Sequence, residues 1–69
     1  MTQKQKINIL LAHAGITQAE LASRIGTSPS NLNQKIKRES LTNDELQQIA
    51  KAVNASWEAY FLLPDGTRI

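Results

Sequence analysis

Hydrophobic residues recur at helical spacing along most of the chain, and polar capping residues precede each group. The first group occupies positions i, i+3, i+4 and i+7 of one helix face: Ile7, Leu10, Leu11 and Ala14. It follows the stretch TQKQ at residues 2–5, which has the form of a capping box. Gly15 comes directly after it, and glycine readily adopts the left-handed conformation that ends a helix. The pattern predicts a first helix between Thr2 and Gly15.

Two short helices are predicted next, with almost nothing between them. The stretch TQAE at residues 17–20 is a second capping box, and the inner side of the helix behind it consists of Leu21, Ala22 and Ile25. Gly26 ends this helix near residue 25. Ser28 caps the following helix, and Pro29 occupies its first position, where the missing N–H costs nothing. This third helix, expected to end near Lys37, has a narrow apolar side formed by Leu32 and Ile36.

The rest of the chain predicts two more helices and a turn. The stretch TNDE at residues 42–45 is a third capping box and precedes the apolar positions Leu46, Ile49, Ala50 and Val53. Ser56 is expected to begin a short fifth helix that carries Trp57, Tyr60 and Phe61. The stretch PDG at residues 64–66 favours a turn, so the tail is expected to form a small hairpin, an extended arm to a second chain or a frayed terminus.

Composition limits the functions open to the chain. Its 69 residues allow one small domain with a core too small for an enclosed catalytic cavity. With 41% hydrophobic and 20% charged residues it resembles an ordinary globular protein. It has no cysteine, no apolar run of membrane-spanning length and no secretory signal pattern, so a cytoplasmic location is expected. We expect no enzyme activity, no cofactor or metal, no membrane contact and no small-molecule ligand, since His13 is the only histidine and no catalytic motif is present.

Positive charge is concentrated in the middle of the chain. Residues 17–38 contain four basic residues and Glu20 as the only acidic one, a local balance of +3, whereas the remainder has a balance of −1. The basic residues are Arg24, Lys35, Lys37 and Arg38. A positive segment on a nearly neutral body favours a polyanionic partner, although a solubilising surface accounts for the charge equally well.

The third predicted helix has a polar outer face. With Leu32 turned inward, the step of about 100° per residue places Ser30, Gln34 and Lys37 on the far side. Asn33 falls on one flank, and Asn31 and Lys35 fall on the other. Short amides and hydroxyls can pair with base edges in the major groove, and lysine can reach a guanine or a phosphate. Residues 17–37 therefore predict a helix-turn-helix.

The stretch TQAELASRIGTS resembles the Cro/repressor-type (XRE-like) helix-turn-helix family of phage and bacterial transcriptional regulators. The resemblance rests on Gln18, Ala22, Gly26 and Leu32 and extends more loosely across residues 5–62. It implies an all-α, five-helix lambda-repressor-like fold. We therefore expect a DNA-binding domain over residues 1–62 and a turn or tail over residues 63–69.

The resemblance also implies that Gln18 contacts a phosphate and that five residues face the bases: Ser28, Pro29, Ser30, Asn33 and Gln34. The basic loop after the third helix adds Lys37, Arg38 and Ser40 as phosphate contacts, with a solvated basic loop as the alternative. The expected base-reading residues are Ser28, Pro29, Ser30, Asn31, Asn33 and Gln34. The expected phosphate-contacting residues are Thr17, Gln18, Thr27, Lys35, Lys37, Arg38 and Ser40. Pro29 departs from the family pattern because it can offer only an apolar contact. Lys35 stands where the family usually has an apolar residue, which frees it for a phosphate. Leu11 and Ile36 stand where some members have a buried arginine–glutamate pair, a replacement that is often neutral or stabilising.

These features predict a sequence-specific regulator of transcription that binds duplex DNA, acts as a repressor by occupying an operator, and binds as a homodimer. The expected dimer contact comprises Trp57, Phe61, Leu62 and Leu63, which are many apolar groups for a chain end. Two alternatives remain: an adaptor that binds another protein, such as an antitoxin or anti-regulator, and a nonspecific DNA-binding protein.

Overall fold

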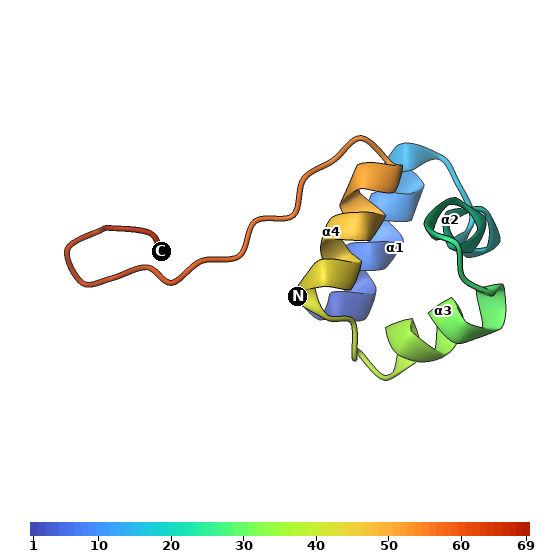
Figure 1. Ribbon diagram of the computed structural model, residues 1–69, viewed down its shortest axis with the longest axis horizontal. Helices are drawn as coiled ribbons and strands as arrows, with labels where there is room; N and C mark the ends of the chain where they lie inside the picture. The colour runs from blue at the N-terminus through green and yellow to red at the C-terminus, as the bar shows by residue number, and fades with distance from the viewer.

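The computed structural model describes all 69 residues and contains four α-helices. They are α1 (Gln3–Ala14), α2 (Gln18–Ile25), α3 (Pro29–Lys37) and α4 (Asn43–Ala52). In Figure 1, α1 and α4 form one side of a helical body and α2 and α3 form the other. The residues after α4 leave this body as an arm on the side away from α2 and α3 (Figure 1). None of the helices is both long enough and apolar enough to cross a membrane.

Capping residues begin the helices where the sequence predicts. The capping boxes at Thr2 and Thr42 are both closed in both directions, and the hydroxyl of Ser28 accepts a hydrogen bond from the Asn31 N–H. Thr17 also caps its helix, but the second predicted box is incomplete. The carboxylate of Glu20 binds Arg24 at 3.2 Å instead of returning to the Thr17 N–H. An arginine at i+4 offers this carboxylate a charged partner on the same helix face.

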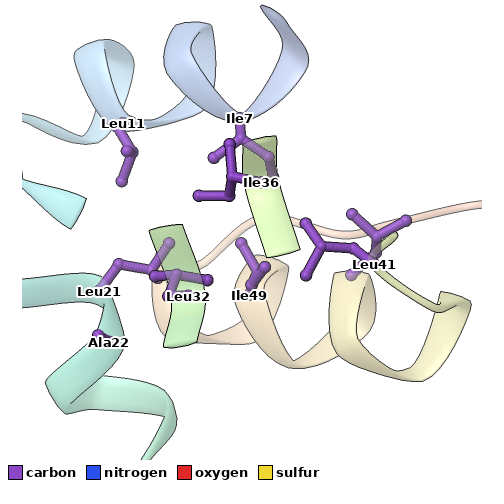
Figure 2. Packing of buried hydrophobic residues seen from close by; sticks show 9 residues of the cluster. Ile7, Leu11, Leu21, Ala22, Leu32, Ile36, Leu41 and Ile49 are labelled. Carbon is purple, nitrogen blue, oxygen red and sulfur yellow. The ribbon is translucent and has the colours of Figure 1, made fainter. Parts of the chain in front are cut away.

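Nine buried apolar residues form the core, and every helix contributes to it. Figure 2 shows that Leu32 and Ile36 of α3 point between Ile7 and Leu11 of α1 on one side and Leu21 of α2 on the other. Leu32 and Ile36 are each only 1% exposed. The prediction that this pair anchors the third helix is therefore confirmed. Ala14, expected on the inner face of the first helix, is exposed at its last turn.

The predicted fifth helix is wrong. Helix α4 ends when Asn54 takes the left-handed conformation at φ 57°, and the Ala55 N–H then binds the Ala50 carbonyl at 2.8 Å. This is a Schellman-type termination. The residues that follow it form no helix and leave the body as an arm (Figure 1). A new helix would have to nucleate within about six residues, and so short a helix gains too few hydrogen bonds to offset the cost of its first turn.

The tail forms a minimal hairpin, one of the three forms expected for it. Leu62 and Arg68 make an isolated antiparallel bridge, and the Leu63 N–H binds the Thr67 carbonyl at 2.8 Å. Gly66, at φ 89°, supplies the left-handed residue that the tight turn needs. No regular strand extends from this bridge.

Candidate nucleic-acid interface

Helix α3 has one buried side and one open side. Leu32 and Ile36 fix it to the core, whereas Ser30 and Gln34, on the opposite side, are exposed. Asn33 lies between these two sides and is half-buried. Figure 1 shows α3 at the edge of the body, with no other segment of the chain over its outer side. The polar edge predicted for this helix is therefore accessible.

Three polar side chains on α3 have groups that the fold does not use. Ser30, Asn33 and Gln34 make no side-chain hydrogen bonds within the molecule. A side-chain amide offers both hydrogen-bond donors and an acceptor, and a hydroxyl can either donate or accept a hydrogen bond. These three residues present to solvent the donor and acceptor mix that can pair with base edges.

The other predicted base-reading residues lie at the start of α3 and are partly engaged. The Ser28 hydroxyl accepts from the Asn31 N–H at 3.1 Å, and the Asn31 amide donates to the Thr27 hydroxyl at 2.8 Å. Pro29 is exposed and has no N–H to donate. These contacts fix the turn between α2 and α3, so its residues are held in place before any partner arrives.

Fewer basic side chains in this region are unpaired than the sequence suggests. Arg24 is paired with Glu20 and also donates to the Ala52 carbonyl at 2.9 Å, toward α4. Lys35 forms an ion pair with Glu45 of α4. Lys37 and Arg38 have no ion-pair partner and are exposed. Two free cations therefore remain beside α3, rather than four.

The Lys35–Glu45 pair affects the titration of its carboxylate. The hydrogen bond from Lys35 is the largest cause that lowers the pKa of Glu45 below its ordinary 4.5, and the Thr42 N–H lowers it further. The lowered pKa keeps the Glu45 carboxylate charged at neutral pH, where it pairs with Lys35. The prediction that Lys35 is free for a phosphate did not take this partner into account.

The beginning of α2 offers a second polar surface. Gln18 is half-buried, its side chain makes no hydrogen bond within the molecule, and Thr17 is exposed beside it. The first N–H groups of a helix carry partial positive charge and favour an anion. The remaining predicted phosphate contacts are Thr27, which is half-buried, and Ser40, which is exposed.

Several contacts that the sequence did not reveal hold α3 at a fixed angle. The Gln3 amide exchanges two hydrogen bonds with the backbone of Leu41, at 3.1 and 3.0 Å, and so joins α1 to the loop after α3. The Glu39 carboxylate in the same loop accepts from the Lys4 N–H at 3.2 Å. These partners lie more than thirty positions apart, so helical spacing gives no sign of them.

The predicted dimer residues fall into two environments. Trp57 packs against the chain's own core, donates to the Asn43 side chain at 3.3 Å and has Lys6 over its ring at 5.5 Å. Phe61 and Leu62 are 75% and 67% exposed, and Leu63 is half-buried. Trp57 therefore belongs to the folded body, and the free apolar groups lie beyond it.

Comparison with known proteins agrees with this geometry. Residues 6–57 match the family described as the Cro/C1-type HTH DNA-binding domain. Over 47 residues, 68% of this chain, the sequence is 40% identical to the repressor protein CI of Enterobacteria phage phi80. The matched region covers 20% of the length of that repressor. No solved structure gives a significant match. The chain belongs to the Cro/C1-type family of helix-turn-helix DNA-binding domains.

Proposed function

We propose that the protein is a sequence-specific regulator of transcription that inserts α3 into the major groove of an operator. The observation that supports this proposal most is the contrast between the buried apolar side of α3 and its exposed polar side. Leu32 and Ile36 are buried, while Ser30 and Gln34 on the outer edge and Asn33 on its flank keep unused polar groups. A rigid helix with such an edge suits direct readout of bases.

The roles divide between specificity and affinity. Gln34 and Asn33 can each pair bidentately with adenine, and Ser30 can donate or accept. In this proposal Gln18, Lys37 and Arg38 contact phosphates, which adds affinity without sequence information. Occupancy of an operator then blocks or repositions polymerase, the mechanism we infer for repression. The printed name of the phi80 relative, a repressor, supports this direction of control.

We further propose that two copies bind a roughly palindromic operator. One small module buries only about 600–1,000 Å² on DNA, so a second copy is needed for tight binding. Two-fold symmetry would place the two copies of α3 about 34 Å apart on successive major grooves. The exposed apolar residues of the hairpin support an interface there: Tyr60, Phe61, Leu62 and Ile69.

Selection of bound duplexes from a random pool tests the function. The proposal expects recovery of one preferred, nearly palindromic sequence. An adaptor that binds another protein would recover no duplex even at low salt, and a nonspecific DNA-binding protein would recover duplexes without a common sequence. Either result would refute sequence-specific regulation.

Phe61→Lys tests the dimer. A charged side chain in an apolar interface should reduce the sedimentation mass and weaken operator binding. Ala59→Lys is the matched control, because Ala59 is an exposed neighbour and the variant gains the same charge. Equal behaviour of the two variants would place the interface elsewhere.

A further inference from the structure

Lys35 lies on the flank of α3 that faces α4, outside the polar edge formed by Ser30 and Gln34. Together with Asn31 and Gln48 it borders a hollow of about 140 Å³ between α3 and the neighbouring helices. Its side chain is 38% exposed and that of Glu45 is 25% exposed. The pair is therefore accessible to solvent but directed toward the body of the protein.

The Glu45 carboxylate is fixed on both of its oxygens. Oε1 accepts from the Thr42 N–H at 3.1 Å and from the Thr42 hydroxyl at 3.2 Å, which closes the capping box of α4. Oε2 accepts from Lys35 Nζ. A carboxylate held in a capping box costs less side-chain entropy to pair than a free surface carboxylate. The sequence accounts for Glu45 by its capping role alone, and the structure adds this second role.

The ion pair also has a distinctive position in the fold. It is the only ion pair that joins two helices, since the other one, Glu20–Arg24, lies within α2. Between the two partners the chain turns through Glu39, a left-handed residue at φ 52°. Glu45 thus connects the C-terminal half of α3 to the first turn of α4 across this loop.

Pairing changes what Lys35 can do beside DNA. A phosphate would have to displace a charged, hydrogen-bonded carboxylate to gain this lysine. Phosphate contacts raise affinity for every duplex alike, because they carry no base information. A lysine that is kept from phosphates therefore favours discrimination between sequences over total affinity.

We propose that Glu45 is a specificity-determining residue: it holds Lys35 against α4, withholds that lysine from DNA phosphates and so limits binding to unrelated duplexes. This inference rests on the proposed function, since it assumes that α3 faces DNA. Glu45 acts through Lys35 and does not itself touch DNA, so it is a positioning residue.

Glu45→Gln tests the role without loss of the helix cap, because glutamine also closes a capping box. The probe is a duplex of mixed sequence, and the readout is the slope of log affinity against log salt. Release of Lys35 to a phosphate should steepen this slope by about 0.9 relative to the unmodified protein. The ratio of operator affinity to mixed-duplex affinity should fall in the same variant.

Asp44→Asn is the matched control. Asp44 is the exposed neighbour of Glu45 and makes no ion pair or side-chain hydrogen bond, so its variant changes the net charge equally and leaves Lys35 held. Its slope should stay close to that of the unmodified protein. Lys35→Met alone should also leave the slope unchanged, and adding it to Glu45→Gln should cancel the steepening.

Two results would overturn this role while leaving the proposed function intact. One is a slope reduced by about 0.9 in Lys35→Met, since Lys35 would then already contact a phosphate. The other is equal slopes for Glu45→Gln and Asp44→Asn. Failure of the unmodified protein to bind any duplex would instead refute the proposed function, and this role with it. The Lys35–Glu45 pair can also be tested without DNA, by measuring the pKa of Glu45 in an NMR titration. Lys35→Met should raise this pKa toward its ordinary value, and an unchanged pKa would contradict the pairing.

Discussion

Helix α3 and the arm over residues 56–69 use apolar residues in opposite ways. In α3, Leu32 and Ile36 lie four apart and both reach the core, which leaves a polar edge outside. In the arm, Trp57 and Phe61 also lie four apart, but only Trp57 contacts the core. Phe61 is 75% exposed, and the backbone between the two residues is not helical.

The difference shows that helical spacing needs a surface on which to pack. The apolar side of α3 is covered by α1 and α2, and tertiary burial supplies most of the stability of a short helix. Residues 58–61 have no such cover, so their spacing did not produce a helix. In the proposed dimer, a second copy would cover the apolar residues of the arm.

The largest expected effect comes from removing the anchor of α3. Leu32→Ala should lower the free energy of unfolding by about 2–5 kcal/mol, because the side chain is fully buried. That is a large part of the total of about 3–10 kcal/mol expected for a chain of this size. Leu62→Ala is the counterpart in the arm and should change stability by less than about 0.5 kcal/mol. Urea unfolding at a fixed low protein concentration measures both. Equal losses would contradict the comparison.

Trp57→Ala should give an intermediate effect and locate the boundary between body and arm. Trp57 is half-buried, and a half-buried aromatic side chain stabilises a fold less than a fully buried one. We therefore expect the free energy of unfolding to fall by about 1–3 kcal/mol. Thermal unfolding of Trp57→Ala and Phe61→Ala, both at low protein concentration, makes the comparison. A larger loss for Phe61→Ala would mean that the arm packs on the body.

The smallest effect is the pH dependence from Glu45. Its pKa lies below 4.5, so the carboxylate stabilises the fold above pH 4.5, and this contribution disappears as the pH falls through the lowered pKa. Glu45→Gln should therefore be less stable than the unmodified protein at pH 7, by at most about 1 kcal/mol for a partly exposed pair. The difference should vanish in acid below that pKa. A difference that persists there would have another cause.

Sequence patterns predicted the parts of the fold that depend on local chemistry. All four N-caps and the glycines that end α1 and α2 follow from the short-range rules for helix ends, and the core positions of α3 follow from the helical period. The prediction of a fifth helix was wrong because local sequence does not show whether a surface exists on which that helix could pack. The prediction that Ala14 is buried was wrong for a similar reason, since Ala14 is exposed at the last turn of α1.

The candidate site was less predictable than the fold. The outward direction of Ser30 and Gln34 follows from the burial of Leu32 and from helix geometry alone. The electrostatics follow only in part. The Glu20–Arg24 pair has the i, i+4 spacing that a helix favours, but the contacts of Lys35 with Glu45 and of Arg24 with the Ala52 carbonyl join different helices, so local sequence does not specify them. Charges counted along a sequence overestimate the free cations wherever helices bring acidic residues beside them.

The central claim is that the outer edge of α3 reads bases, and base preference measured for two variants tests it most directly. Gln34→Ala should lose about 1–3 kcal/mol of discrimination at one position of the operator and leave the other positions unchanged. Lys37→Ala should weaken binding to all duplexes alike and reduce the salt slope by about 0.9. If Gln34→Ala instead weakens every duplex equally, as Lys37→Ala does, α3 does not read sequence and the account is contradicted.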